Sequence, residues 1–413
     1  MAKVRPFICV RPCTEQASEV AALPYDVYSR KEAKEVVQGH PLSFLNIDRP
    51  ETQYDESFDM YSDKAYETAR DMLRKEIRDG VFVVDQDASY YIYELTMDGR
   101  SQSGIVACCS IDDYLNNVIK KHENTRAEKE QDRIRHVDVC SAQTGPIFLA
   151  YRANAILKAI LDKVKENDCL YDFVSDDGIG HRVWKIDSPA DIDVIESTFD
   201  GISEIYISDG HHRCASAVKV GLKRREEPGY RPGQESDYFL AVLFADEELK
   251  ILPYNRAVHD LNGLSADEYL QKVSGAFLIE DLGKEDYQPV KHGEIGMNLG
   301  GEWYRLTAKP EVLSAVEKDP VARLDVSILQ DQLLDPILGI KDPKTSDRID
   351  FVGGIRGTAE LDKLVGQGYG VAFSMYPTQM SELLAVADAG LLMPPKSTWF
   401  EPKLRSGLFI HQI

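Results

Sequence analysis

The sequence lacks paired cysteines, a long apolar run and any internal repeat or low-complexity tract. Its seven cysteines are an odd number and include no C-x-x-C pair, which argues against a disulfide framework or a structural zinc site. No apolar stretch is long enough to cross a membrane, and the run from Phe7 to Val10 is too short for a signal-peptide core. We therefore expect a cytoplasmic protein without a membrane partner.

Basic residues are outnumbered by acidic residues. The chain has 48 Lys and Arg against 69 Asp and Glu, which gives a formal net charge of −21. A broad nucleic-acid-binding face needs an excess of positive charge, so the sequence argues against this class but leaves room for a local basic pocket. The 413 residues, 43% of them hydrophobic, suffice for two or three packed units of a soluble protein.

The most informative stretch that is present is Ser208-Asp209-Gly210-His211-His212-Arg213. The apolar run 202–207 before it predicts a buried strand, and residues 214–220 after it predict a short amphipathic helix that ends at Gly221. A strand, a tight turn and a helix in this order direct backbone N–H groups and the positive end of the helix at one point. Such a point binds anions, most commonly phosphate.

Each side chain of this turn suits that chemistry. Gly210 lets the backbone bend and a ligand approach, and the guanidinium of Arg213 can hold a phosphate. His211 and His212 can donate, accept or transfer protons, and Asp209 can hold a magnesium ion or accept a proton. The alternative is an ordinary Asp-Gly turn with solvated side chains, but two histidines and an arginine directly after Asp-Gly favour a functional site.

A second polar set precedes a charged helical stretch that runs to residue 136. His122, Glu123, Thr125 and Arg126 could supply a general base and phosphate contacts. The dense mixed charge of this region is typical of a solvated helix, and spacing alone favours that interpretation.

A third set lies in the proline-rich segment 393–403. Lys396, Ser397, Thr398 and Lys403 could contact an anion. A loop ordered by its prolines, with Trp399 and Phe400 filling a core, accounts for the same residues equally well.

The remaining patterns predict a mixed α+β chain. Ser29 can cap a helix that starts at residue 30, and Asp98-Gly99 predicts an antiparallel hairpin. We expect a helix over 147–165 and adjacent antiparallel strands at 238–244 and 251–256. The fold class is therefore α/β in the mixed sense, with a central mixed sheet, antiparallel hairpins and strand–helix crossovers, followed by a C-terminal α/β part. We expect a soft boundary that separates residues 1–260 from 261–413.

The order of several motifs resembles one bacterial and archaeal family of unknown function that is often labelled ParB-like. The motifs are Pro24-Tyr-Asp-Val, His122-Glu-Asn-Thr, Gly145-Pro-Ile-Phe-Leu149, Asp209-Gly-His-His-Arg213, Pro253-Tyr-Asn-Arg256 and Pro394-Pro-Lys-Ser-Thr-Trp-Phe400. The resemblance covers almost the whole chain. It implies that residues 1–260 form a catalytic domain similar to the ParB/sulfiredoxin superfamily.

The Asp209–Arg213 element itself is similar to that of the free-serine kinases in this superfamily. The resemblance implies that the turn holds nucleotide phosphates, with Asp209 near the metal or the reacting hydroxyl. The family's His-Glu-x-Thr segment falls on His122, Glu123 and Thr125. The chain departs from DNA-partitioning ParB proteins because it is acidic and has no evident helix-turn-helix, so we expect no DNA partner. It also lacks the Gly-Cys-His-Arg form of sulfiredoxin, since Cys214 follows the arginine, and sulfinic-acid repair is not expected.

The sequence and the resemblance together favour a phosphotransferase that uses ATP or ADP, with magnesium at Asp209, and acts on a small hydroxylated metabolite, free serine first. Asp209, His211, His212 and Glu123 would be catalytic, and the phosphate contacts would come from residues 210–213 with His122, Thr125 and Arg126. A phosphatase acting on phosphoserine or a similar ester, or a nucleotide-binding regulatory protein without turnover, remains as an alternative. The sequence assigns no oligomeric state.

Overall fold

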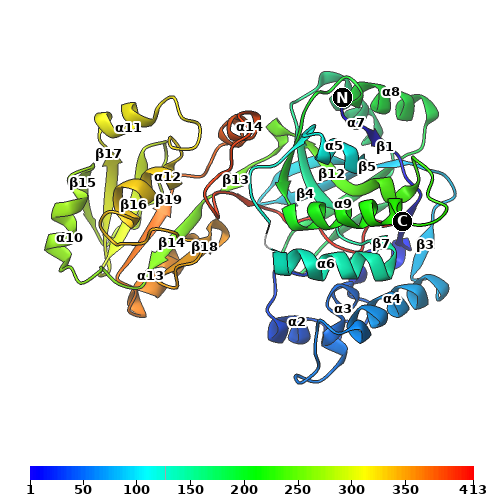
Figure 1. The fold of residues 1–413 in the computed structure, drawn as a ribbon, viewed down its shortest axis with the longest axis horizontal. Helices are drawn as coiled ribbons and strands as arrows, with labels where there is room; N and C mark the ends of the chain where they lie inside the picture. Colours follow the sequence, from blue (N-terminus) through cyan, green and yellow to red (C-terminus); the bar gives the residue numbers. More distant parts are fainter. Residues whose placement is uncertain (126) are drawn as a thin grey trace. The chain divides into compact units, whose positions relative to one another are not determined.

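The computed structural model describes residues 1–125 and 127–413 (Figure 1). The chain forms two compact units, of which the first comprises Met1–Leu249 with Pro402–Ile413 and the second comprises Lys250–Glu401. The second unit is therefore inserted into the first, and the last residues of the chain return to the unit that the N-terminus began. The sequence patterns place the division near residue 260, whereas the compact units divide after Leu249 and again after Glu401.

The first unit is built on a nine-stranded mixed sheet with the order β6-β11-β8-β12-β5-β4-β10-β9, to which β1 adds alongside β5. β8 runs parallel to β12 and β6 parallel to β11, while the other pairs are antiparallel. The predicted fold class, a mixed α/β chain with a central mixed sheet and antiparallel hairpins, is confirmed.

The strands of the first unit are β1 Val4–Arg5, β2 Cys9–Pro12, β3 Phe82–Val84, β4 Tyr90–Met97, β5 Arg100–Ser110, β6 Ile119–Lys120, β7 Ala142–Gln143, β8 Ile147–Tyr151, β9 Tyr171–Val174, β10 Gly180–Ile186, β11 Ile205–Asp209, β12 Tyr238–Ala245 and β21 Ile410–Gln412. Its helices are α1 Ala17–Val20, α2 Arg30–Val36, α3 Leu45–Asp48, α4 Asp63–Arg78, α5 Ile111–Leu115, α6 Ala127–Cys140, α7 Ala155–Val164, α8 Pro189–Phe199 and α9 His211–Arg225. None of the helices in the described part of the chain is long and apolar enough to span a membrane.

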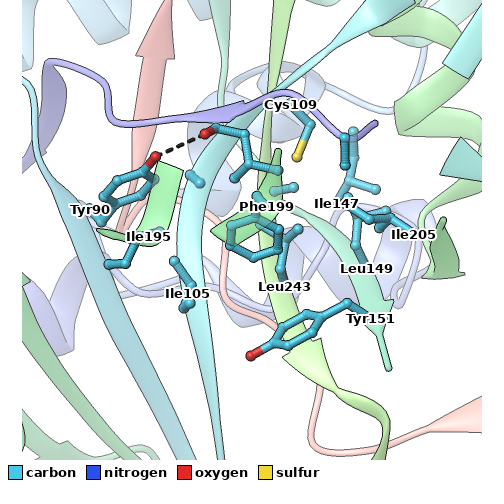
Figure 2. Packing of buried hydrophobic residues seen from close by; sticks show 14 of the residues in the cluster. Tyr90, Ile105, Cys109, Ile147, Leu149, Tyr151, Ile195, Phe199, Ile205 and Leu243 are labelled. Carbon is cyan, nitrogen blue, oxygen red and sulfur yellow. Dashed lines mark hydrogen bonds between the residues drawn. The ribbon is translucent and has the colours of Figure 1, made fainter. Parts of the chain in front are cut away.

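One face of the large sheet carries the main hydrophobic core. Alternate strand residues, such as Ile147 and Leu149 of β8, point to this face and pack with Phe199 of α8 (Figure 2). Tyr90 brings a hydroxyl into this core and donates it to the Val4 carbonyl at 2.8 Å, so the polar atom is satisfied. The alternation follows from the two-residue period of a strand.

The opposite side chains of the sheet meet the C-terminal segment of the chain. Tyr91 and Tyr93 of β4 contact Phe409, with ring centroids 5.5 and 5.6 Å apart. The strand that follows Phe409, β21, lies between β2 and β7 in a four-stranded sheet with the order β3-β2-β21-β7. The end of the chain is therefore an interior element of the first unit.

The helix predicted over residues 147–165 is wrong. Its first part is the strand β8, whose five residues are all buried between β11 and β12, and only α7 is helical, capped by the Asn154 side chain. A short apolar run has no periodicity that separates a buried strand from a buried helix. The partners that decide the case lie far away in the sequence.

The predicted helix stop at Gly221 is also wrong, because α9 continues to Arg225. Gly221 serves close packing instead. A Cβ atom at this position would lie 2.4 Å from the Ser236 carbonyl oxygen and 2.8 Å from Ile111 Cδ1. Only a residue without a side chain lets α9 approach these neighbours.

The strands predicted as an adjacent antiparallel pair at 238–244 and 251–256 belong to different sheets. β12 pairs with β5 and β8 in the first unit. The chain then enters the second unit, where β14, Tyr254–Val258, pairs with β18 and β19. Pro253 lies directly before β14 and cannot donate a ladder hydrogen bond, which fits a break between the two sheets.

The second unit contains a six-stranded antiparallel sheet with the order β15-β17-β16-β19-β14-β18 and a small pair, β13 with β20. Trp303, Val352 and Leu361 are among the residues of its core cluster. Its strands are β13 Ile251–Leu252, β14 Tyr254–Val258, β15 Phe277–Gly283, β16 Glu294–Leu299, β17 Glu302–Ala308, β18 Ile349–Gly353, β19 Val371–Met375 and β20 Trp399–Phe400; its helices are α10 Ala266–Val273, α11 Pro310–Val316, α12 Asp325–Leu329, α13 Gly357–Gly366 and α14 Met380–Asp388.

The packing of Gly221 predicts the effect of a single methyl group. Gly221→Ala should lower the free energy of unfolding by about 1–3 kcal/mol, because the added Cβ meets a backbone carbonyl that cannot rotate away. Gly366→Ala, at a helical site in α13 where a Cβ meets nothing within 4 Å, should not lower it. Urea unfolding of both variants measures the difference, and equal stability of the two variants would refute the packing argument.

Candidate functional site

The turn from β11 to α9 occupies a single residue. Gly210 has φ 89° and ψ 30°, a left-handed conformation that glycine adopts without strain. α9 starts at the next residue and has no side-chain cap at its N-terminus. The predicted order of strand, tight turn and helix is therefore present, and the first backbone N–H groups of a 15-residue helix converge beyond the end of β11.

The Asp209 carboxylate is held between the turn and the C-terminal segment. Its Oδ1 accepts a hydrogen bond from the Gly210 backbone N at 2.8 Å, and its Oδ2 pairs with Lys403 Nζ at 3.0 Å. Burial alone would raise the pKa of Asp209, but the cations of Lys403 and Arg213 outweigh burial and hold the pKa well below its ordinary value. Asp209 is therefore ionised at neutral pH. Lys403, which was predicted only as an anion contact within the 393–403 segment, pairs with it.

Two buried imidazoles lie beside this turn. His122, from the loop between β6 and α6, meets His211 edge to face with ring centroids 4.6 Å apart. His122 is only 2% exposed and His211 7% exposed. No described residue makes a well-formed hydrogen bond to either nitrogen of His122 or to the Nε2 of His211, although the Ile207 carbonyl lies near enough to His122 to influence its pKa. Buried polar atoms of this kind are rare in folded proteins and commonly mark a functional site or the place of a bound group.

Burial keeps both imidazoles neutral. It lowers the pKa of His122 to about 4, against a smaller opposing effect of the Asp209 charge and of the nearby Ile207 carbonyl. Burial, with His122 next to it, also lowers the pKa of His211 well below the ordinary range. At neutral pH each ring therefore offers one N–H donor and one bare nitrogen rather than a positive charge.

Arg213 folds back toward the turn that precedes it. A Cβ at position 210 would lie 3.1 Å from Arg213 Nε, so a side chain there would crowd Arg213 in addition to straining the backbone bend. Arg213 NH1 donates to the Pro146 carbonyl at 2.7 Å. The side chain lines a crevice of about 30 Å³ together with Tyr25, Arg133 and Ser406, among other residues, which is room for a water molecule but not for a ligand.

The second polar set is only partly at the turn. His122 lies at the turn, as described above. The Thr125 hydroxyl donates to Glu130 Oε2 at 2.7 Å, so Thr125 is tied to α6. Glu123 and His212 are half-buried, and their predicted roles stay predictions. Arg126 lies outside the described residues.

The third polar set is divided between the two units. Lys403 belongs to the first unit and pairs with Asp209. Lys396, Ser397 and Thr398 belong to the second unit, where the buried Ser397 hydroxyl donates to the Pro394 carbonyl at 2.7 Å. The four residues are therefore not a single set within one unit.

The charged helix α6 carries residues that spacing alone assigned to solvent. Glu130, Arg133 and His136 are buried on one face of it, and α6 itself lies alongside α9 (Figure 1). Glu130 pairs with Lys219 of α9, whereas Arg133 and His136 reach the backbone carbonyls of Asp48 and Ile47 in α3. Arg133 stacks on the Tyr25 ring at 4.0 Å and lines the crevice with Arg213. The three-residue spacing 130, 133 and 136 is a helical signal for a buried face, and the density of charge obscures it.

The residues do not form a dedicated magnesium site. No group of three or more potential ligands occurs in the part of the chain that the structure describes, and both oxygens of Asp209 already have partners. Magnesium at Asp209 stays a prediction, and no step below depends on it.

The fold is that of a mixed α/β protein in which the strand–turn–helix element at Gly210 leaves the start of α9 without a side-chain cap. A family model described as "Protein of unknown function (DUF1015)" matches residues 4–327, and the chain belongs to this family. No curated protein matches the sequence.

Several solved structures resemble the fold. C-terminally truncated SbnI from Staphylococcus aureus has a TM-score of 0.39 and 11% identity, over 73% of this chain and 85% of that one. A conserved hypothetical protein from Pyrococcus furiosus has a TM-score of 0.34 and 15% identity, over 74% and 94% of the two chains. A free serine kinase variant in complex with AMP has a TM-score of 0.34 and 12% identity, over 73% and 91%. Likeness at this level establishes no shared chemistry.

The buried, neutral His122 predicts loss of stability in acid. Its folded pKa of about 4 lies below the ordinary value of 6.5, so the unfolded chain binds a proton that the folded chain does not. The free energy of unfolding should therefore fall as pH drops from 6.5 to 4, by as much as roughly 3 kcal/mol from this residue. Urea unfolding at pH 7.5, 6, 5 and 4 measures the loss.

His122→Gln should flatten this pH dependence, because glutamine does not titrate. The matched control is His40→Gln, at an exposed histidine between α2 and α3. If the His122→Gln and wild-type proteins lose stability in parallel between pH 6.5 and 4, His122 is not the neutral buried group described here.

Proposed function

We propose that the β11–α9 turn binds the phosphate groups of ATP or ADP, and that the protein transfers a phosphoryl group between this nucleotide and a small hydroxylated metabolite. The observation that supports the proposal is the meeting of an uncapped helix N-terminus with the buried, unpartnered nitrogens of His122 and His211. A phosphate oxygen would supply the acceptors that the helix N–H groups and the imidazole N–H groups lack.

Charge at the turn suits a phosphoryl group. Arg213 and Lys403 bring two cations to one carboxylate, Asp209, so the turn keeps a surplus positive charge in a chain whose net charge is −21. Phosphoryl transfer depends mainly on positioning and on electrostatic stabilisation of the transferring group. Arg213 and Lys403 would stabilise the charge on its oxygens, and the two neutral imidazoles would orient it.

The chemical step forms one bond and breaks one. The acceptor hydroxyl oxygen bonds to the terminal phosphorus, the bond from that phosphorus to the bridging oxygen of the nucleotide breaks, and the shortened nucleotide leaves. The hydroxyl proton passes to an ionised carboxylate, as it does to the catalytic aspartate of protein kinases. Asp209 is ionised at neutral pH, and its low pKa suits it to orienting the acceptor hydroxyl rather than to keeping the proton. Glu123 is the other carboxylate predicted for the proton.

The resemblance of Asp209–Arg213 to free-serine kinases selects the first substrates to test, which are ATP or ADP as donor and serine as acceptor. Arg213→Gln should weaken ADP binding by roughly tenfold or more, since a charged hydrogen bond is lost. It should reduce phosphoserine formation by about 10²–10³-fold. Calorimetry measures ADP binding, and ³¹P NMR follows serine with ATP or ADP, with and without magnesium.

The control is Lys158→Ala, which removes an exposed cation on α7 that pairs with Asp162. This variant should bind and turn over as wild type does. Unchanged ADP affinity in a folded Arg213→Gln protein would contradict the proposal. Hydrolysis of phosphoserine without transfer would identify the phosphatase alternative, and ADP binding without either product would identify a regulatory nucleotide-binding protein.

A further inference from the structure

An open cavity of about 890 Å³ lies in the first unit, apart from the residues of the β11–α9 turn. It is lined by the 25–30 segment, by Arg49 and the 3₁₀ turn Pro50–Gln53, by residues at the start of α4 and by α6. The phosphate and nucleotide contacts of the proposed function lie outside this cavity. Its volume falls in the range of about 300–1,000 Å³ that is usual for small-molecule sites.

The cavity and the Arg213 crevice share two of their lining residues, Tyr25 and Arg133. Tyr25 and Arg133 therefore lie at the boundary between the cavity and the crevice that the Arg213 side chain lines. A ligand in the cavity and a nucleotide at the turn would approach each other across Tyr25 and Arg133. Donor and acceptor of a transferred group need such proximity.

Positive charge slightly exceeds negative charge in the lining, although Arg135 also pairs with Asp63 outside it. Four arginines, at positions 30, 49, 133 and 135, face three carboxylates. Two of the arginines are paired within the wall, Arg49 with Glu51 and Arg133 with Asp132.

Arg30 is different, because it donates only to the backbone carbonyls of Asp55 and Phe58, at 3.1 and 2.8 Å. No carboxylate of the described residues lies within ion-pairing distance of it. A half-buried guanidinium without a counter-charge is suited to an anionic ligand.

The aromatic residues of the wall favour hydroxyl contacts over base stacking. The Arg133 guanidinium covers a face of Tyr25 at 4.0 Å, and Arg135 covers a face of Tyr66 at 4.5 Å. Tyr25 and Tyr28 bond Arg49 NH1 through their backbone carbonyls at 2.9 Å, and their phenolic hydroxyls make no hydrogen bond to any described residue. These hydroxyls can donate to or accept from the hydroxyl groups of a ligand.

We propose that this cavity binds an anionic, hydroxyl-rich metabolite with the size and chemistry of a sugar phosphate, and that Arg30 binds its negative charge. Binding of the metabolite in the cavity is independent of the proposed function. Only its role as the phosphoryl acceptor rests on that function. A free amino acid such as serine would leave most of the cavity empty, since cavities of this volume hold drug-sized ligands. The cavity therefore points to a larger acceptor than the resemblance suggests.

Calorimetry with four probes tests the proposal: glucose 6-phosphate, ribose 5-phosphate, glucose and inorganic phosphate. At least one sugar phosphate should bind the wild-type protein at least about tenfold more tightly than glucose and than inorganic phosphate, because charge and hydroxyl contacts both contribute. Arg30→Ala should weaken this binding at least about tenfold, and Arg30→Lys, which keeps the charge and loses the planar fork, should weaken it less. The matched control is again Lys158→Ala.

ADP binding separates this inference from the proposed function. Arg30→Ala should leave ADP affinity within about twofold, because Arg30 is not part of the turn. Failure of ADP to bind, with Arg30-dependent binding of a sugar phosphate, would end the proposed function and leave the cavity assignment standing. The inference would be overturned if no sugar phosphate binds more tightly than glucose and inorganic phosphate, or if Arg30→Ala leaves sugar-phosphate affinity unchanged. It would also be overturned if Arg30→Ala loses as much affinity for ADP as for the sugar phosphate, which would place the nucleotide in the cavity. If Arg30→Ala does not fold, the sugar-phosphate and ADP affinities of Arg30→Lys and Arg135→Gln are compared with those of the wild type instead.

Discussion

The left-handed backbone of Gly210 is the constraint on which the site depends. Because the chain passes from β11 to α9 in one residue, the Asp209 carboxylate, the His211 ring and the Arg213 guanidinium are fixed by two rigid elements rather than by a loop. A side chain at position 210 would strain the backbone and also meet Arg213 at 3.1 Å. Gly210 therefore favours both the uncapped start of α9 and the position of the Arg213 side chain next to it.

At this turn, the charges and the imidazole hydrogen-bonding groups come from different residues. Burial keeps His122 and His211 neutral, and neighbouring cations keep Asp209 ionised. The positive charge of the site therefore comes from Arg213 and Lys403, and the imidazoles contribute direction rather than charge. The charges of such a site stay the same across the physiological pH range. The cost is that buried polar atoms are left without hydrogen-bond partners.

Local signals predicted much of the fold and the centre of the site. Ser29 caps α2 through a capping box with Glu32, Asp98-Gly99 forms the hairpin between β4 and β5, and the turn at Gly210 lies between strand and helix as its sequence indicates. Each of these features is decided by residues a few positions apart. The strand β8, the tight packing at Gly221 and the buried face of α6 are decided by partners tens of residues away, which a single sequence does not reveal. For the same reason Lys403 could be suspected as an anion contact, while its pairing with Asp209, 194 positions earlier, could not be inferred.

The insertion of the second unit has a consequence for synthesis on the ribosome. Lys403, which neutralises Asp209, and β21, which fills the gap between β2 and β7, both follow the inserted residues 250–401. A nascent chain that has already emerged through β12 has every strand of its large sheet, yet its small sheet lacks an inner strand and its turn lacks a cation. The small sheet and the Asp209–Lys403 pair can therefore be completed only after residues 402–413 have been translated.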